Sequence, residues 1–189
     1  MTVMSADALY LTNDDEANRL LATDPLALLI GFVCDQQVLL QKAFAAPYEL
    51  RARIGTLDAH AIATMDPGAL EAAFKEKPAL HRFPGTMAQR TQELCAVVDE
   101  EYGGDAARIW TGAADGADLA RRLLALPGIG DMKMRSIVSI LGKRLDVRPQ
   151  GWEEQAPNHH CLGDIDSPQA LVAYQDAKRA YKASQRAAK

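Results

Sequence analysis

The stretch LALPGIGDMKMRSIVSIL, from Leu124 to Leu141, carries the strongest structural signal in the chain. It predicts a helix that ends near Ala125, a tight turn through residues 126–130, and a second helix that begins at Asp131. Glycine adopts backbone conformations that other residues avoid, and its lack of a Cβ lets another backbone approach closely. We therefore expect a glycine corner between two helices, locked by apolar residues on both sides: Leu123, Leu126, Ile129, Ile137 and Ile140.

The start of the second helix is a candidate phosphate site. The first amides of a helix have no acceptor within the helix, and they lie at the positive end of its dipole. A turn made by Gly128, Ile129 and Gly130 would offer these amides to an anion without needing much formal charge. Lys133 and Arg135, one turn further on, can add charge to neighbouring phosphates. The alternative interpretation is an ordinary helical hairpin with a glycine turn.

These residues resemble the helix-hairpin-helix motif, and their surroundings resemble the HhH-GPD superfamily of base-excision DNA glycosylases. The spelling LPGIG followed by an apolar helix is typical of the motif. A second likeness is LLIGFVCDQQVLLQKAF, which resembles the glycosylase helix that carries paired glutamines, here Gln36 and Gln37. The two segments lie about 90 residues apart, as in the family, and the resemblance covers roughly Pro25 to Trp152.

The resemblance implies an all-α, two-lobed fold with DNA lying across the cleft between the lobes. One lobe would be six helices over residues 24–140, with the hairpin at about 115–142. Residues 1–23 and 143–189 would form the second helical lobe. The resemblance also implies that backbone carbonyls of Leu124, Leu126 and Ile129 hold a monovalent cation, K⁺ or Na⁺, which bridges to a DNA phosphate.

The catalytic aspartate of the family has no counterpart at its usual place. Hydrolysis of an N-glycosidic bond needs a carboxylate beside the sugar of an extruded nucleotide. The resemblance puts that carboxylate within residues 149–151, which are Pro, Gln and Gly. Asp146 comes a few residues early, and Glu153 and Glu154 a few late, so each would serve only with a shifted loop register.

Asp35 is the remaining candidate for the catalytic carboxylate. It directly precedes Gln36 and Gln37 on the helix that the resemblance places in the cleft, where apolar neighbours would perturb its pKa as catalysis requires. The two glutamines would fill the gap left by a flipped base or contact its edge. A solvated or ion-paired Asp35, for example with Lys42, and two solvated glutamines are the alternative.

Lyase activity is not expected. Bifunctional members of the superfamily carry a lysine two residues after the second hairpin glycine, where this chain has Met132. Lys133 follows, but one helical residue turns a side chain by about 100°, so we expect it to face a phosphate. An iron–sulfur cluster is excluded because the chain has only three cysteines, Cys34, Cys95 and Cys161, without a CxxC spacing.

Other residues with suggestive chemistry have simpler interpretations. Trp110 and Trp152 could stack on a base but are more typical of a core. The sequence His159-His160-Cys161 suggests a metal, yet no further ligand stands at a suitable spacing, which favours a polar loop.

The overall charge argues against wrapping of nucleic acid by bulk electrostatics, because the 189-residue chain has a net charge of −4. The charge is nevertheless uneven. Seven basic and two acidic residues lie from Arg121 to Arg148, and five basic and no acidic residues lie from Lys178 to Lys189. For the basic C-terminal segment a solvated helix face is the favoured interpretation, because a basic chain end needs no ligand.

The remainder of the chain predicts an all-α protein of about nine or ten helices in one folding unit. Asn13 is expected to cap the first helix, Asp24-Pro25 to start a helix that runs through Phe44, and Ser167 to cap the last. Two short alternating segments, ALYLT and RLDVRP, are too short for a sheet.

No stretch approaches the roughly 18 consecutive apolar residues of a membrane span, and the first residues do not resemble a signal peptide. We therefore expect no membrane contact and a cytoplasmic location, nucleoid-associated in a prokaryote.

The sequence thus favours a DNA-binding base-excision repair protein of the glycosylase type, with damaged double-stranded DNA as partner. It would release a modified base by hydrolysis, without lyase activity. A catalytically inactive protein that binds DNA or senses damage is the first alternative, and a helical scaffold that binds another protein is the second.

Overall fold

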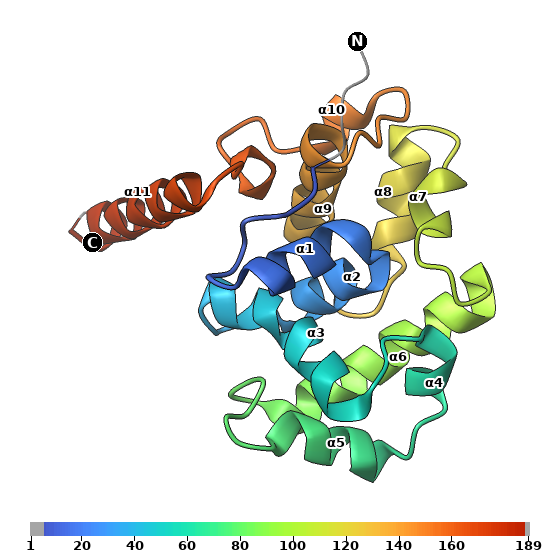
Figure 1. Cartoon of the computed structure of the whole chain (residues 1–189). Coiled ribbons are helices and arrows are strands. Elements are labelled where there is room, and N and C mark those ends of the chain that lie inside the picture. The colour runs from blue at the N-terminus through green and yellow to red at the C-terminus, as the bar shows by residue number, and fades with distance from the viewer. Residues whose placement is uncertain (1–5, 188–189) are drawn as a thin grey trace.

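The computed structural model describes residues 6–187, which are all-helical and contain no strand (Figure 1). They form eleven α-helices and one 3₁₀-helix, slightly more than the sequence predicted because α7 and α10 are single turns. The elements are α1 (Asp15–Thr23), α2 (Pro25–Cys34), α3 (Leu40–Ile54), α4 (Ala59–Ala63), α5 (Pro67–Lys75), α6 (Pro84–Tyr102), α7 (Arg108–Thr111), α8 (Gly116–Leu124), α9 (Asp131–Arg144), α10 (Trp152–Gln155), η1 (Leu162–Asp164) and α11 (Pro168–Ala187).

Several helices begin at an aspartate whose carboxylate accepts a hydrogen bond from an amide of the first turn. Five helices, α1, α2, α4, α5 and α8, are capped in this way, by Asp14, Asp24, Asp58, Asp66 and Asp115. The cap of α1 is Asp14 and not Asn13, whose place is one residue too early for the first turn. The predicted cap of the last helix is confirmed, since the Ser167 hydroxyl accepts from the Ala170 amide at 3.2 Å.

Helix α2 lies at the centre of the fold and is apolar on every side, as expected of a helix surrounded by others. It packs on α1, α3 and α6, while α4 and α5 pack on α6. Gly31 permits the closest approach: a Cβ there would lie 2.6 Å from the ring of Phe44 on α3. Phe32 packs edge-to-face on the same ring, with centroids 4.9 Å apart.

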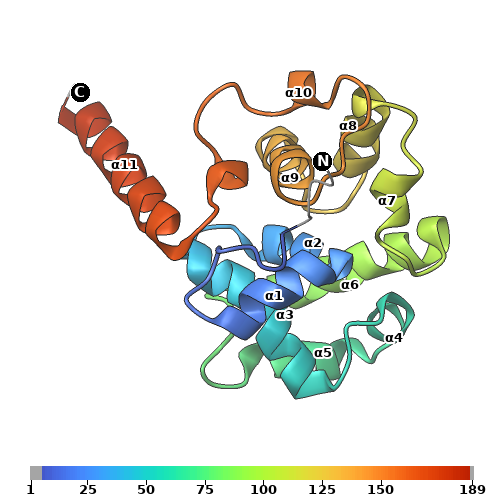
Figure 2. The ribbon, with the colours of Figure 1, turned by 45° about the horizontal axis from the view of Figure 1, so that its top comes forward.

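A second group of elements, α8, α9, α10 and η1, packs together and lies on the other side of α2 in the views of Figures 1 and 2. Close backbone contacts again depend on glycine. A Cβ on Gly142 of α9 would lie 2.3 Å from the Trp152 ring, and one on Gly163 would lie 2.6 Å from the Ser139 carbonyl oxygen. The structure groups α1 with α2 and α3 by contact. The division into lobes at residues 24–140 stays a prediction.

Helix α11 projects from this body, as Figure 2 shows. Leu171 is its one buried residue among those whose placement is described. Because the rest of α11 is exposed or half-buried, its side chains are free to contact something else.

Two expectations about α2 and α3 are corrected. The predicted helix from Asp24 through Phe44 is broken at residues 35–39, and α3 continues beyond Phe44 to Ile54 with Pro47 inside it. No single helix in the described range has the length and apolarity to cross a bilayer; α1 and α2 reach the threshold only as a pair, and the pair is bent by 114°.

Candidate nucleic-acid interface and carboxylate site

The hairpin between α8 and α9 has the predicted bounds, but its two glycines differ in conformation. Gly128 has φ of +79°, the left-handed region, and its backbone lies against Val33 of α2, where a Cβ would be 3.5 Å from a methyl group. Gly130 is extended, with φ of −95° and ψ of −178°, so the corner requires glycine for its conformation only at Gly128. Leu126 and Ile129 are buried and anchor the hairpin to the core.

The first amides of α9 are open. Gly130 occupies the N-cap position and supplies no side chain, in contrast to the five helices capped by aspartate. Within residues 6–187, the amides of residues 130–133 have no hydrogen-bond acceptor. Gly128 and Gly130 are exposed, and a Cβ on Gly130 would meet nothing within 4 Å. This end of α9 therefore has the geometry of an anion site.

The two basic residues in the first turns of α9 do not behave alike. Arg135 pairs with Asp131, Nε to Oδ2 at 3.0 Å, so part of its charge is already neutralised beside the hairpin. Lys133 is half-buried and donates from Nζ to the Gly128 carbonyl at 3.3 Å. Burial lowers the pKa of Lys133, and Asp35 acts in the opposite direction. The amine of Lys133 is thus close enough to Asp35 for the two charges to influence each other, while its contact with a phosphate stays a prediction.

Asp35 stands at the C-terminal cap of α2 and is half-buried. Burial raises the pKa of Asp35 above its ordinary value of 3.8, while the ammonium groups of Lys133 and Lys178 act to lower it. The same carboxylate contributes, after burial, to raising the pKa of Tyr174. Groups from α2, α9 and α11 thus come together around one carboxylate. The perturbed pKa agrees with the expectation for Asp35, while its catalytic role stays a prediction.

The glutamines lie in the break between α2 and α3 and not on a helix, which corrects their expected setting. The Gln36 carbonyl accepts from His81 Nε2 at 2.9 Å, and its side-chain oxygen accepts from Arg90. Gln36 is therefore held in place from α6 and the loop before it. Gln37 is exposed, with φ of +56°, and is the glutamine free to reach a ligand.

His81 determines the shape of this break. It is only 1% exposed, and the Phe83 amide donates to its Nδ1 at 3.0 Å. The ring must therefore carry its hydrogen on Nε2, which donates to the Gln36 carbonyl. Burial lowers the pKa of His81, and the positive charges of Lys42 and Arg82 act in the same direction.

Replacing His81 with phenylalanine should lower the free energy of unfolding by about 2 kcal/mol, because it leaves a carbonyl and an amide without partners.

The stability of the wild type should also depend on pH through His81, because the folded state disfavours the protonated ring. The contribution of His81 to stability is fully present above pH 6.5 and is lost as pH falls toward the lowered pKa. Urea unfolding at pH 7 and pH 5 checks both. In His81→Phe the part of the acid-induced loss that comes from His81 should disappear, whereas the exposed control His159→Phe should match the wild type. An equal loss in both variants would contradict this role for His81.

Two large apolar side chains are strongly exposed on the segments next to the candidate site, an exposure that the sequence did not indicate. Leu39, at the end of the break, is 75% exposed, and Met132, on the first turn of α9, is 84% exposed. Leu39 stands in the apolar run VLL, which sequence patterns assign to a helix face, so only the break reveals it.

Two grooves meet near these residues. The first, of about 510 Å³, is lined by α9, α10, the loop after α10 and Tyr174 of α11, and it includes Met132 and Arg135. The second, of about 390 Å³, lies between residues 38–41 and α11 and includes Leu39 and Lys178. Tyr174 of α11 lines both grooves.

The other candidate carboxylates are placed differently. Asp146 lies beyond the C-terminal end of α9, about 20 Å from the hairpin by the rise of the helix, and pairs with Arg148 at 3.5 Å. Residues 149–151 lie beside the start of α8, where the Gln150 carbonyl accepts from the Gly116 amide at 2.8 Å. Glu153 and Glu154 are exposed and line the first groove.

The two tryptophans have structural roles. In the described residues, the His159-His160-Cys161 sequence does not form part of a metal-binding cluster. Trp110 is buried, and Trp152 packs on Gly142, so neither ring is a free stacking surface. Cys161 is buried, with its Sγ 3.3 Å from Ser139 Oγ and from Asp164 Oδ2. In the part of the chain that the structure describes, no three His, Cys, Asp or Glu side chains are grouped to hold a metal ion.

No family model matches this chain, and no curated protein matches it.

Proposed function

We propose that this all-helical protein binds damaged double-stranded DNA and releases a modified base by hydrolysis of its N-glycosidic bond, as an HhH-GPD-type DNA glycosylase would. The observation that carries the proposal is the open start of α9 beside a half-buried carboxylate with a raised pKa. The first provides an anion site for a phosphate, and the second provides a group suited to reaction at the neighbouring sugar.

The proposed reaction assigns a separate task to each group. Amides of residues 130–133 and the amine of Lys133 bind phosphates on the damaged strand, while Leu39 and Gln37 occupy the space that the extruded nucleotide leaves. Asp35, ionised beside Lys133, stabilises the positive charge that develops on the sugar as the bond to the base breaks, and it accepts a proton from the attacking water.

The hairpin carbonyls can accommodate the monovalent cation that the resemblance implies. The Leu126 carbonyl already accepts from the Ile129 amide at 3.2 Å, but a carbonyl oxygen keeps a second lone pair. Leu124, Leu126 and Ile129 would hold the ion, which would supply a positive charge to one phosphate. Lys133, on the Gly128 carbonyl, already brings an ammonium to the same turn.

The proposed activity is hydrolysis without lyase activity, and the position of Lys133 makes that statement directly testable. Lyase chemistry needs an amine that attacks the sugar carbon and forms a Schiff base, which borohydride reduces to a stable adduct. Wild-type protein incubated with abasic duplex and borohydride should give no adduct on a denaturing gel. An adduct that disappears in Lys133→Ala would overturn the monofunctional part of the proposal.

Replacing Gly130 with valine should weaken binding to all duplexes by about tenfold, which corresponds to the loss of one charged hydrogen bond. The new side chain would occupy the open space at the amides, where it meets no protein atom. Phosphate contacts carry no sequence information, so the loss should be the same for every sequence. Fluorescence anisotropy with several abasic-analogue duplexes measures it; a loss confined to some sequences would contradict a phosphate site.

The fold should tolerate this substitution, because the extended backbone at Gly130 suits valine. The free energy of unfolding should change by less than about 1 kcal/mol, the ordinary range for an N-cap position. Weak binding of Gly130→Val can then be attributed to the ligand site.

A non-catalytic damage sensor is the second candidate, because residues 149–151 carry no carboxylate and lie at the start of α8. A panel of duplexes with alkylated, deaminated and oxidised bases separates the two. Release of any base supports the glycosylase, whereas binding without release of any base supports the sensor. If an abasic-analogue duplex binds no better than tRNA or heparin and binding does not weaken with salt, a protein-binding scaffold replaces both.

A further inference from the structure

We propose that α11 is a second DNA-binding element, which grips the phosphate backbone beyond the cleft through Lys178, Lys182 and Arg186. This inference rests on the proposed function and extends it, because neither the hairpin nor Asp35 requires α11 to contact DNA. The projecting helix, its charge and its position beside Asp35 carry the argument.

The charge of α11 is opposite to that of the protein. The chain has a net charge of −4, whereas α11 holds four basic residues and one acidic residue. Arg179 pairs with Asp176, NH2 to Oδ1 at 2.8 Å. Lys178 lies over the Tyr174 ring, 5.8 Å from its centroid. A cationic arm on an acidic protein is complementary to a polyanion and is repelled by another basic surface.

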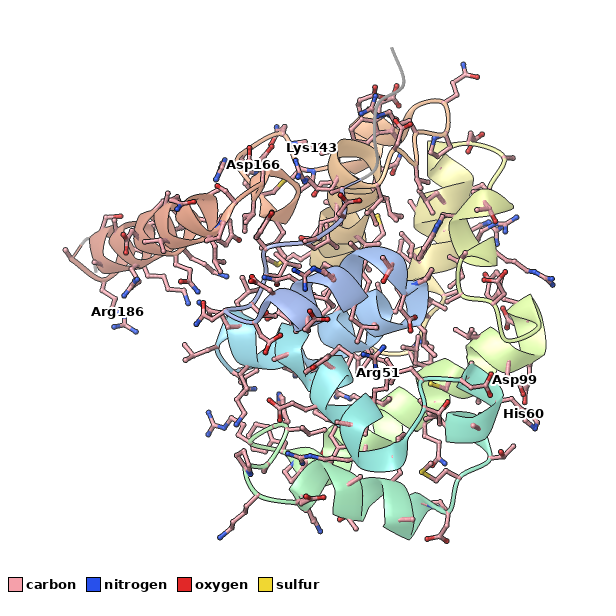
Figure 3. The ribbon with its side chains drawn as sticks, in the orientation of Figure 1. Arg51, His60, Asp99, Lys143, Asp166 and Arg186 are labelled. Carbon is pink, nitrogen blue, oxygen red and sulfur yellow. The ribbon has the colours of Figure 1, made fainter. Side chains whose placement is uncertain are left out.

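The three cations are spaced along one run of the helix. Lys178, Lys182 and Arg186 follow each other at intervals of four residues, or about 6 Å along the axis. Their side chains therefore form a gradually turning stripe. Figure 3 shows Arg186 near the outer end of α11, away from the body of the protein. A basic residue near a helix C-terminus is favourable for the helix itself, but Lys178 lies mid-helix, where this explanation does not apply.

The stripe begins at the candidate site. Lys178 and Lys182 line the groove that α11 forms with residues 38–41, where Leu39 protrudes. Lys178 and Lys133 are both near enough to Asp35 to influence its charge. A strand whose phosphates meet Lys133 would therefore bring neighbouring phosphates toward Lys178. The occupant that fits is the backbone of the damaged duplex.

The test compares Lys178→Ala/Lys182→Ala with Lys75→Ala/Lys77→Ala, which removes the same charge from exposed positions at the end of α5. Alanine favours helix, and neither lysine of α11 is buried, so the fold should be retained. Anisotropy of an abasic-analogue duplex is measured at several salt concentrations for the full-length protein. Each phosphate contact contributes about 0.9 to the slope of log K against log salt.

The α11 variant should lose about 1.8 from that slope and bind at least about tenfold more weakly at 0.1 M salt, while the α5 variant matches the wild type. Equal slopes in the two variants would overturn the role of α11 and leave the proposed function intact. A wild-type protein whose duplex binding is independent of salt would overturn the proposed function and this inference together. A normal slope in both variants with slow base release only in the α11 variant would also exclude a phosphate grip.

Discussion

Asp35→Asn protein is expected to bind abasic-analogue duplex with wild-type affinity and to release modified bases at least about 10³-fold more slowly. The amide keeps the shape of the carboxylate but cannot carry the charge that stabilises a cationic sugar or accept a proton from water. Single-turnover release from the best substrate of the lesion panel measures the effect. Matched variants of the other carboxylates, Asp146→Asn, Glu153→Gln and Glu154→Gln, should retain the wild-type rate. Unchanged release by Asp35→Asn would eliminate Asp35.

The dependence on pH follows from the same surroundings. Lys133 from α9, Lys178 and Tyr174 from α11, and Cys34 on α2 are the titratable groups around Asp35. The rate should rise with pH through the pKa of Asp35, which lies above 3.8, and fall as Lys133 loses its proton below its usual 10.5. Lys133→Ala should remove the alkaline limb of the profile.

The free energy of unfolding of Asp35→Asn shows whether a loss of activity in this variant comes from misfolding. Because the pKa of Asp35 is raised, the folded state binds its proton more tightly than the unfolded state does. The charged carboxylate therefore opposes folding above its folded pKa, and this cost disappears below the ordinary value of 3.8. Asp35→Asn should be at least as stable as the wild type at pH 7, a pattern common for functional residues.

Gly142→Val is expected to lower the free energy of unfolding by about 3 kcal/mol, the largest stability effect that we predict. A Cβ at this position would lie 2.3 Å from two atoms of the Trp152 ring, within a packed region between α9 and α10. Relief would require the ring to leave its place, and α10 with it. Urea denaturation measures the loss.

Two further variants make this prediction specific. Gly130→Val is the same substitution on the same helix and should cost little stability, because the added side chain meets no protein atom. Trp152→Ala should make Gly142→Val much less harmful, so that the double variant is less destabilised than the sum of the two single variants. Additive losses would show that the ring is not the source of the conflict.

The features of the fold that could be predicted from the sequence are those determined by neighbouring residues. Asp24 followed by Pro25 starts a helix, and Gly103 ends one in the left-handed conformation, as their positions indicate. Such signals act within one turn of helix, so no knowledge of the rest of the chain is required. They suffice to predict an all-helical chain.

The break between α2 and α3 could not be predicted because its cause lies 45 residues away. No Gly or Pro interrupts the segment CDQQVLL, and its pattern continues as a helix. In a continuous helix the Gln36 carbonyl would accept a hydrogen bond from an amide one turn later, but here it accepts from His81 Nε2. The backbone of Gln37 lies in the left-handed region. The exposure of Leu39 follows from this contact.

The direction of Lys133 was beyond sequence reasoning for a related reason. Helical geometry correctly separates the directions of Met132 and Lys133 by about 100°, but it does not say which of them faces α2. The side that faces α2 depends on how the hairpin packs against Val33 of α2 at Gly128. The hairpin itself could be identified from the sequence, whereas the groups that surround Asp35 required the fold.

The projection of α11 also makes it the part of the protein most open to proteolysis. Beyond Leu171 this helix has little packing to hold it, so its outer turns can unfold locally at small cost. Trypsin should cut first after Lys178, Arg179 or Lys182 and leave the core of the protein whole. A strand lying along the stripe would shield these bonds, so the digestion rate would itself report whether the arm is occupied.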